Sequence, residues 1–338
     1  MAGLLSTSEV NATLVGDESL SSRPMRRIIE PLEKMNISMS HEDGLLPIRI
    51  ENNNKKNFPA KHSLRIGSAQ VKSSILLAAL NIKGTTSIKE NIPSRDHTEI
   101  MLKYLGANLT RKKNLISLTS PNFLKPKNLF IPGDFSSAAF VIIAVLLSTN
   151  SEVTIKDVGL NFYRIGLLEV LKKMNAKIKI YNKQKFNGEI VGDIKIKSSE
   201  LKGTNVSKSL SPRLIDEYPI LFVAASFASG TSNFYGLNEL KIKESNRLKT
   251  MSTALSNNGV KLKLGENSIQ IKGNKFQEGG KEVLTENDHR IAMSMLVFGF
   301  FSKKSIVVDN MNMIKTSFPG FKEIFQKIGA SIELFQKS

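Results

Sequence analysis

The sequence predicts an α/β (α+β) fold of two domains, each built from repeated βαβαββ units. Two observations carry this prediction. A pattern of one helix followed by a hydrophobic strand recurs along the 338 residues, and a second helix in each repeat is apolar on nearly every side. The chain is long enough for two hydrophobic cores, and its 41% hydrophobic and 23% charged residues are typical of globular proteins.

The recurring helix ends each time in Gly or Asn, before a hydrophobic strand. These closing residues are 70, 69, 84 and 70 positions apart, at Asn36, Gly106, Asn175, Gly259 and Gly329. Gly and Asn are the residues that most readily adopt the left-handed conformation at a helix C-terminus. We therefore expect surface helices over the segments that precede them: Pro24–Met35, Asp96–Leu105, Arg164–Met174, Arg247–Asn258 and Phe318–Ile328.

A second helix, expected to be buried, lies upstream in four of the repeats. Its copies are Ser68–Leu80, Ser136–Leu147, Pro219–Ala228 and Arg290–Phe301. Strands are expected over 151–156 and 304–309, and a hairpin over 261–271. Units that each expose one buried helix must pack together, which predicts a radial cluster with these helices in the middle. If several of them start at one face, their N-termini make that face an anion site.

Charge and composition narrow the class of function. The net charge of +18 suits anionic partners such as nucleic acid, acidic lipid or phosphorylated metabolites, although scattered lysines are also typical of a solvated surface. No RNA-binding signature or zinc-finger spacing is present. The absence of cysteine excludes disulfides, thiolate metal sites and thiol nucleophiles, and it favours the cytoplasm. With only four histidines, a multi-histidine metal site is not expected.

Two further features argue against a membrane protein. The apolar runs are about 12 residues long, short of the ~18–20 residues that a bilayer requires. Residues 1–10 carry no basic region before their apolar part, so they do not resemble a signal peptide.

Polar residues at the starts of the buried helices are the first site candidates. They are Ser68-Ala69-Gln70, Asp134 with Ser136 and Ser137, Asp216-Glu217, and Asp288-His289-Arg290. Ser and Asp commonly cap helices, and we expect Ser136 and Ser137 to do so. Capping explains Asp216 and Arg290 less well, since arginine has no acceptor atom with which to cap.

Arginines just before the surface helices form a second set: Arg23, Arg95, Arg164 and Arg247. A planar guanidinium suits bidentate binding of carboxylate or phosphate, whereas the alternative for each is an exposed salt bridge. Lys243 and Arg247 are four residues apart and are expected to share a helix face, with Glu244 three residues before the arginine.

Seven segments, in order along the chain, resemble motifs of the 5-enolpyruvylshikimate-3-phosphate synthase family. They are Leu20-Ser-Ser-Arg-Pro-Met25, Gly67-Ser-Ala-Gln-Val-Lys-Ser73, Arg95-Asp-His-Thr-Glu99, Ile215-Asp-Glu-Tyr-Pro219, Ile242-Lys-Glu-Ser-Asn-Arg-Leu248, Asn287-Asp-His-Arg-Ile-Ala-Met293 and Thr316-Ser-Phe-Pro319. The resemblance is to the class II-like branch, in which Ser-Ala-Gln replaces Ser-Ser-Gln. One departure is Asn246, where the family carries Asp, and we interpret it as a tolerated neighbour.

The resemblance implies a fold and a reaction. The fold is a two-domain inside-out α/β barrel that divides near 129–133 into residues 1–130 and 131–338, with the substrates in the cleft between the domains. The second domain then holds three units and the first, incomplete, about one and a half. In the implied reaction, phosphoenolpyruvate gives its enolpyruvyl group to the 5-hydroxyl of shikimate 3-phosphate, through a tetrahedral intermediate, and phosphate leaves.

The resemblance also implies a role for each matching residue. Phosphoenolpyruvate is held by Arg23, Gln70, Arg247 and Arg290. Shikimate 3-phosphate is held by Ser68, Ala69, Gln70, Arg95, Asp216 and Lys243. Asp216 takes the hydroxyl proton and Glu244 moves the proton at the methylene carbon. No metal or organic cofactor is implied; the partners are the two small anions, with no nucleic acid or membrane, and a monomer is expected.

Two other functions stay open. One is an enolpyruvyl transferase that acts on a UDP-sugar, although many such enzymes use a cysteine and this chain has none. The other is a non-catalytic relic, or an RNA-binding protein built on the same repeats. Measuring salt-dependent RNA binding and phosphoenolpyruvate binding side by side distinguishes these non-enzymes from a transferase.

The repeat further predicts that the chain begins inside a buried helix. Ser68 starts such a helix 38 residues before its closing Gly106, and the same offset from Asn36 falls just before residue 1. We therefore expect 1–6 to be a helix tail and roughly 100 residues of the family pattern to precede it. This chain alone should then show no synthase turnover and low solubility, and restoring the upstream segment should rescue both. Turnover at rates typical of enzymes contradicts the expectation.

Overall fold

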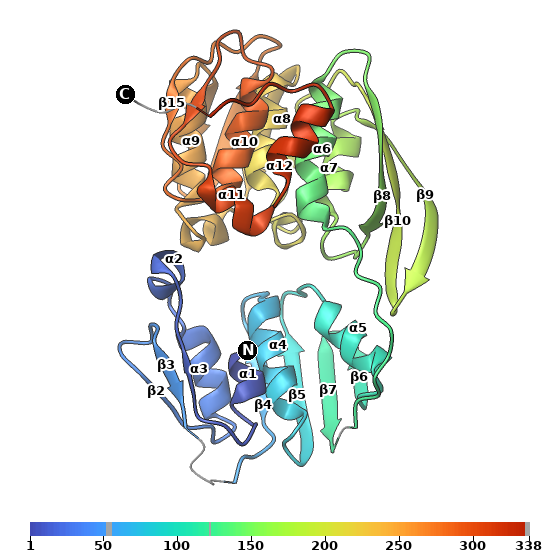
Figure 1. The fold of residues 1–338 in the computed structure, drawn as a ribbon, viewed down its shortest axis with the longest axis vertical. Helices are drawn as coiled ribbons and strands as arrows, with labels where there is room; N and C mark the ends of the chain where they lie inside the picture. The colour runs from blue at the N-terminus through green and yellow to red at the C-terminus, as the bar shows by residue number, and fades with distance from the viewer. Residues whose placement is uncertain (52–55, 122, 335–338) are drawn as a thin grey trace. The chain divides into compact units, whose positions relative to one another are not determined.

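The structure, a computed structural model, describes residues 1–51, 56–121 and 123–334. The chain divides into two compact units. The first is Met1–Ile131 with Lys185–Ile190, and the second is Pro132–Gln184 with Val191–Ser338. Each unit combines β-sheets with packed helices, so the α/β class is confirmed (Figure 1).

The first unit has one helix surrounded by others. Its helices are α1 Ala2–Leu5, α2 Glu18–Ser21, α3 Arg26–Glu33, α4 Ala69–Ala79 and α5 His97–Tyr104. Its strands are β1 Ala12–Leu14, β2 Met39–His41, β3 Ile48–Ile50, β4 Lys61–Leu64, β5 Gly84–Glu90, β6 Leu109–Lys112 and β7 Leu115–Ser120. They form two sheets, in the orders β1-β3-β2 and β4-β5-β7-β6. The buried helix α4 packs against α1, α3 and α5.

The second unit is larger and places three buried helices side by side. Its helices are α6 Phe135–Leu147, α7 Gly166–Lys173, α8 Tyr218–Phe227, α9 Arg247–Asn257, α10 His289–Gly299, α11 Asn312–Ser317 and α12 Phe321–Lys327. Its strands are β8 Glu152–Gly159, β9 Lys177–Phe186, β10 Glu189–Lys197, β11 Asn205–Val206, β12 Gly230–Tyr235, β13 Lys261–Leu264, β14 Ser268–Gly273, β15 Glu282–Val283 and β16 Val307–Val308. The end of β9 and the start of β10, within Lys185–Ile190, are assigned to the first unit. The sheet orders are β8-β10-β9, β11-β12-β14-β13 and β15-β16.

The predicted βαβαββ unit is present in two full copies. The orders β4-α4-β5-α5-β6-β7 and β11-α8-β12-α9-β13-β14 match, and in both copies the first two strands are parallel while the other pairs are antiparallel. A third copy replaces its first strand by a single parallel bridge between Gly133 and Val158. In the last copy the strand expected over 304–309 is only the two-residue β16, and the helix expected over 318–328 is shortened to α12, with a separate α11 before it.

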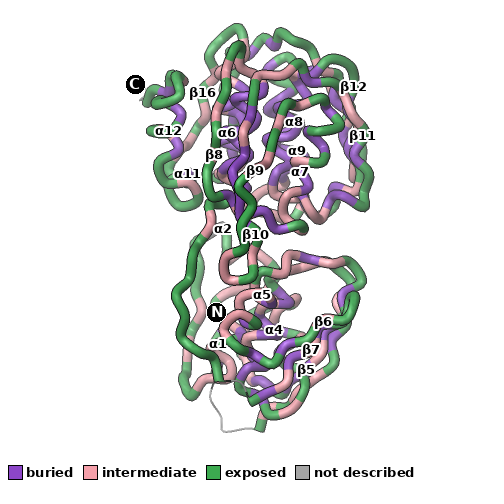
Figure 2. Tube along the Cα trace, turned by 90° about the vertical axis from the view of Figure 1, so that its right-hand side faces the viewer, coloured by how far each residue is buried: buried purple, intermediate pink, exposed green. Residues whose placement is uncertain are grey.

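The helices predicted to be buried are the cores of the two units. In α8, every residue from Tyr218 to Ser226 is buried, and α6 is buried almost throughout (Figure 2). The helices α6, α8 and α10 contact one another in pairs. Each buried Leu, Ile or Phe stabilises its unit by about 1.5–3 kcal/mol, so the apolar surface that the sequence places all round these helices is what brings them together.

The five predicted helix ends share one geometry. The closing residues have φ values of 65°, 98°, 68°, 95° and 100° in chain order. At each end, the N–H of that residue binds the carbonyl three residues back, and the next N–H binds the carbonyl five residues back, at 2.8–3.3 Å. This is the Schellman arrangement. The residues that supply the second carbonyl are all buried: Leu32, Leu102, Leu171, Leu255 and Phe325. The left-handed ends are therefore confirmed.

Candidate active site at the starts of three buried helices

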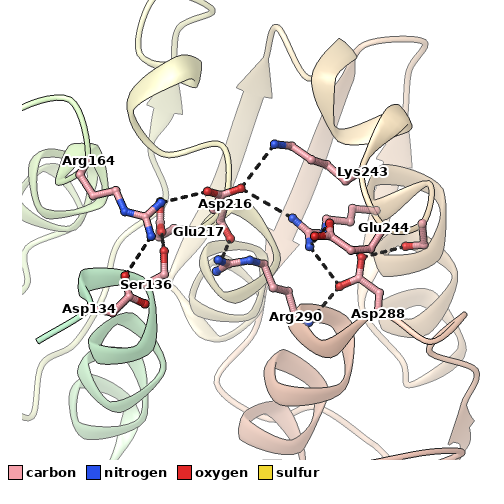
Figure 3. A network of polar contacts seen from close by, with 11 residues as sticks. Asp134, Ser136, Arg164, Asp216, Glu217, Lys243, Glu244, Asp288 and Arg290 are labelled. Atoms are coloured by element: carbon pink, nitrogen blue, oxygen red, sulfur yellow. Dashed lines mark hydrogen bonds and ion pairs between the residues drawn. The ribbon is translucent and has the colours of Figure 1, made fainter. Parts of the chain in front are cut away.

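The N-terminal ends of α6, α8 and α10 meet at one face of the second unit (Figure 3). Ser136, in the first turn of α6, donates a hydrogen bond to Glu217, which precedes α8. Arg290, in the first turn of α10, donates from Nη1 to the backbone carbonyl of Asp216 at 3.2 Å. The helix starts are thus joined by direct contacts, as the prediction of a shared face requires. The partial positive charge of these ends favours anions there.

Asp216 lies at the centre of this face. Its Oδ2 is 2.9 Å from Arg164 Nη1, and its Oδ1 is 3.5 Å from Lys243 Nζ and 3.8 Å from Arg247 Nη1. Arg164 also reaches Asp134, at 3.0 Å, and so links two helix starts. Three cations hold the carboxylate in one place, with 12% of its side chain exposed, which leaves it accessible to a bound ligand.

Arg247 is clamped by two carboxylates. Its Nε and Nη2 donate to the two oxygens of Asp288, at 2.7 and 3.3 Å, and Glu244 pairs with Nη2. Ser245 adds a hydrogen bond to Asp288 at 3.1 Å. Arg247 is 1% exposed and Asp288 0%, so the exposed salt bridge considered for this arginine is wrong.

The Arg247–Asp288 pair stays charged although it is buried. Burial alone would raise the pKa of Asp288, but the charge and hydrogen bonds of Arg247 bring that pKa below its ordinary value. Burial works in the opposite direction on Arg247, and the carboxylates of Asp288 and Glu244 outweigh it and raise the pKa of the guanidinium. The guanidinium is therefore a fixed positive charge at this face.

Lys243 and Arg247 do not share a helix face, contrary to the prediction. Lys243 follows a 3-10 helix over Asn238–Ile242, and α9 begins only at Arg247. The reason is Asn246, whose side chain accepts a hydrogen bond from Lys249 N–H at 3.1 Å and caps α9. Asn and Asp are about equally good N-caps, which accounts for an asparagine where the family carries aspartate. Both cations nevertheless reach Asp216.

The capping roles expected of Ser136 and Ser137 are also wrong. Asp134 caps α6, since its Oδ2 accepts from Ser137 N–H at 2.8 Å and from Ser137 Oγ at 3.0 Å. Ser136 instead binds the buried Glu217. Burial raises the pKa of Glu217 above its ordinary range, and Arg164 offsets that effect only in part.

The other predicted site residues belong to the first unit. Ser68 caps α4 by accepting from Val71 N–H at 3.4 Å, as simple capping predicts, and Ala69 and Gln70 follow in the first turn. Arg95 is half-buried, two residues before α5. Arg23 is half-buried, two residues after α2. The structure thus gathers Asp216, Lys243, Glu244, Arg247 and Arg290 in one network, and it places the remaining five in the first unit.

Several members of the network were site candidates to which the family motifs gave no role. Asp288, Glu217 and Asp134 appeared in the sequence only as polar residues at helix starts, and Arg164 only as one of four repeated arginines. Their roles depend on contacts between segments 30–81 residues apart. Asp288 did have a signal, because it directly precedes His289-Arg290 within a motif.

The described part of the chain, residues 1–51, 56–121 and 123–334, shows neither a metal-ion cluster nor a membrane-spanning helix. No group of three or more His, Asp or Glu side chains there is arranged to hold a metal ion. Within the same described ranges, the helices are all too short or too polar to cross a membrane.

Comparisons with known proteins identify the family to which the chain is similar. Residues 1–325 match the family model of EPSP synthase (3-phosphoshikimate 1-carboxyvinyltransferase). A 3-phosphoshikimate 1-carboxyvinyltransferase of Bartonella quintana is 44% identical over 338 residues, which cover 98% of this chain and 76% of the relative. The EPSP synthase of Acinetobacter baumannii superposes with a TM-score of 0.88 at 37% identity, over 99% of this chain and 77% of that one.

A more distant solved structure has the same fold. It is the enolpyruvyl transferase NikO from Streptomyces tendae, with a TM-score of 0.75 at 14% identity, over 97% of this chain and 75% of that one. The family model and the close relatives, however, go further than the fold. This chain belongs to the EPSP synthase family.

Proposed function

We propose that this site serves the transfer of the enolpyruvyl group of phosphoenolpyruvate to the 5-hydroxyl of shikimate 3-phosphate, with release of phosphate. The observation that carries this proposal is the accessible carboxylate of Asp216, held by three cations where three helix N-termini meet. Both substrates are anions, so a site for them needs fixed positive charge. A carboxylate within that charge can accept the proton of a bound hydroxyl.

The proposed chemistry uses two carboxylates on either side of Arg247. Asp216 takes the proton of the 5-hydroxyl while the oxygen of that hydroxyl bonds to the central carbon of phosphoenolpyruvate. Glu244, in its protonated form, delivers a proton to the methylene carbon, and the carboxylate that results removes one again when phosphate leaves. Glu244 pairs with Nη2 of Arg247, and Asp216 lies 3.8 Å from Nη1, so one guanidinium orients both groups.

Binding roles follow the family motifs. Arg247 and Arg290 are proposed to hold phosphoenolpyruvate, together with Arg23 and Gln70. Ser68, Ala69, Gln70, Arg95, Asp216 and Lys243 are proposed to hold shikimate 3-phosphate. Acid–base groups and fixed charges carry the proposed chemistry, and a monomer is the proposed acting species. The proposed location is the cytoplasm, which suits a sequence that has no cysteine.

The acceptor is tested by calorimetric binding to the chain. Shikimate 3-phosphate should bind measurably, and UDP-N-acetylglucosamine should not. The second acceptor represents the rival transferase, which the NikO-like fold alone leaves open. Binding of the UDP-sugar without binding of shikimate 3-phosphate would reverse the proposal. Salt-sensitive RNA binding without affinity for either small anion would favour a non-enzyme.

Arg290→Ala should weaken phosphoenolpyruvate far more than shikimate 3-phosphate. Loss of one charge-assisted contact should raise the dissociation constant of phosphoenolpyruvate about 10- to 100-fold. The dissociation constant of shikimate 3-phosphate should change less than about threefold. Arg213→Ala is the matched control: Arg213 pairs with Glu169 at 3.0 Å and lies over the Phe162 ring, so this variant removes the same charge from the same unit outside the network. Equal losses for both ligands in Arg290→Ala would rule out this assignment.

A further inference from the structure

Lys72 is a buried charge that the proposed mechanism does not use. It lies in α4, its side chain is 0% exposed, and its Nζ is 3.1 Å from Glu90 Oε1 and 2.5 Å from Glu99 Oε1. Glu90 ends β5 and is fully buried, and Glu99 lies in α5. Arg111 of β6 completes the cluster, 2.8 Å from Glu99 and 3.6 Å from Glu90.

Stability does not explain this cluster. Removing charges from water costs free energy that their mutual attraction often fails to recover, and apolar side chains of similar volume are commonly as stable in such places. Lys72 occupies a helix whose neighbouring buried residues include Val71, Ile75 and Leu76. A methionine would fit that setting by polarity and length. The ionic arrangement therefore calls for a role other than stabilising α4.

The bonds of the cluster converge on the residue before Arg95. Ser94 donates from its N–H and its hydroxyl to Glu90 Oε1, at 3.1 and 2.5 Å, and its carbonyl accepts from Lys72 Nζ at 3.3 Å. All the polar groups of Ser94 are thus bound by the two buried charges. This fixes the backbone that leads into Arg95.

The same lysine connects this loop to the start of α4. Lys72 follows Ser68, Ala69 and Gln70 in the first turns of the helix, and the next residue, Ser73, shares a 2.6 Å hydrogen bond with Thr98 of α5. The start of α4 and the β5–α5 loop are therefore held in a fixed position relative to each other.

We propose that Lys72 and Glu90 are positioning residues that hold Arg95 at the start of α4, so that both grip the phosphorylated acceptor. This inference rests on the proposed function, because it takes Arg95, Ser68 and Gln70 as the shikimate 3-phosphate contacts. Lys72 and Glu90 act through Ser94 and do not touch the substrate. They determine affinity for the acceptor, because Arg95 is assigned to the acceptor alone, whereas phosphoenolpyruvate also has Arg247 and Arg290 of the second unit.

The test compares three variants of the full chain by calorimetry with shikimate 3-phosphate and with phosphoenolpyruvate. Arg95→Ala removes the proposed contact. Lys72→Met/Glu90→Gln removes one positive and one negative charge together, with little change in volume, and leaves the Glu99–Arg111 pair in place. The third variant combines all three substitutions. Ser120→Ala is the control, because it deletes a buried 2.7 Å hydrogen bond to Leu80 at the opposite end of α4.

Arg95→Ala should raise the dissociation constant of shikimate 3-phosphate about 10- to 100-fold, and Lys72→Met/Glu90→Gln about tenfold. The triple variant should bind no more weakly than Arg95→Ala, since Lys72 and Glu90 act through Arg95. In all three variants the affinity for phosphoenolpyruvate should stay within about twofold of that of the unmodified chain. Ser120→Ala should change the affinity for neither ligand. Purely structural roles would give multiplicative losses in the triple variant.

Unchanged acceptor affinity in Lys72→Met/Glu90→Gln, with a loss in Arg95→Ala, overturns the positioning role alone. If Arg95→Ala loses no affinity for shikimate 3-phosphate, both the positioning role and the proposed acceptor contact are overturned. The proposed phosphoenolpyruvate contact is tested separately, by Arg290→Ala. If the double variant does not fold, Ser94→Ala decides, because it removes one bond to Glu90 and keeps every charge. It should weaken shikimate 3-phosphate severalfold, and an unchanged affinity there overturns the proposal.

Discussion

Asp216→Asn should lower turnover by about two to four orders of magnitude, in a preparation that converts both substrates. Asparagine keeps the size of the side chain and can still accept a hydrogen bond from Arg164, which lies 2.9 Å from Asp216 Oδ2. It cannot take the proton of the acceptor hydroxyl. Initial rates of phosphate release measure the effect, and thermal unfolding, which should change little, shows that the fold is kept.

Asp134→Asn is the matched control for this variant. Asp134 binds the same arginine, at 3.0 Å, and is half-exposed, and asparagine can keep its cap on α6. The substitution therefore removes the same charge beside Arg164 without touching a proposed proton acceptor. We expect turnover to fall less than about tenfold. If the two variants lose turnover equally, the effect is one of charge, and the proton transfer assigned to Asp216 is wrong.

Arg247→Ala should destabilise the second unit by about 3–5 kcal/mol, because it leaves the fully buried Asp288 without its counterion. The paired variant Arg247→Met/Asp288→Asn should recover most of this loss, since the buried carboxylate is removed with the arginine and the remaining Glu244 is 24% exposed to water. Asparagine can still accept from Arg290 N–H, which lies 2.9 Å from Asp288 Oδ1 in the present structure. Urea unfolding followed by circular dichroism measures both variants. Both should lose phosphoenolpyruvate affinity.

The destabilisation by Arg247→Ala should depend on pH. In the native protein the pKa of Asp288 is lowered, so its stabilising contribution is present above its unfolded pKa and is lost as pH falls through the folded one. Without Arg247, burial dominates and raises that pKa, so ionisation works against folding at neutral pH. The loss in unfolding free energy should therefore be larger at pH 8 than at pH 4. A pH-independent loss would show that Asp288 is not the source of the effect.

The parts of the fold that could be predicted from sequence are those with strong local signals. The buried helices were predictable because α6 and α8 are apolar on nearly every side, and a helix of that kind has only the interior in which to lie. The hairpin β13–β14 was predictable from its alternating residues and its turn. The strand near Val307 was overestimated, since only two residues pair there, and pairing depends on a partner strand that periodicity does not reveal.

The site was predictable where a motif names a residue, and not where the role depends on a distant contact. Asp216 and Arg247 were identified by their motifs. The clamp on Arg247 by Asp288 joins residues 41 positions apart, and nothing in either local sequence shows it. Lys243 was placed on a helix because a spacing of four suggests one, and the cap at Asn246 outweighed that spacing. Lys72 lies within one of the motifs but received no role from it, because burial of a lysine depends on the carboxylates it meets.

The left-handed helix ends have a consequence for how repeats of this kind are recognised. Each stop signal depends on one backbone torsion and two hydrogen bonds within six residues, so it can be kept while the helix before it changes freely. The surface helices indeed differ in their residues, from the basic start of α3 to the apolar first turn of α7. Divergent copies should therefore be aligned at the point where the helix stops, by matching the glycine or asparagine that ends the helix in each copy.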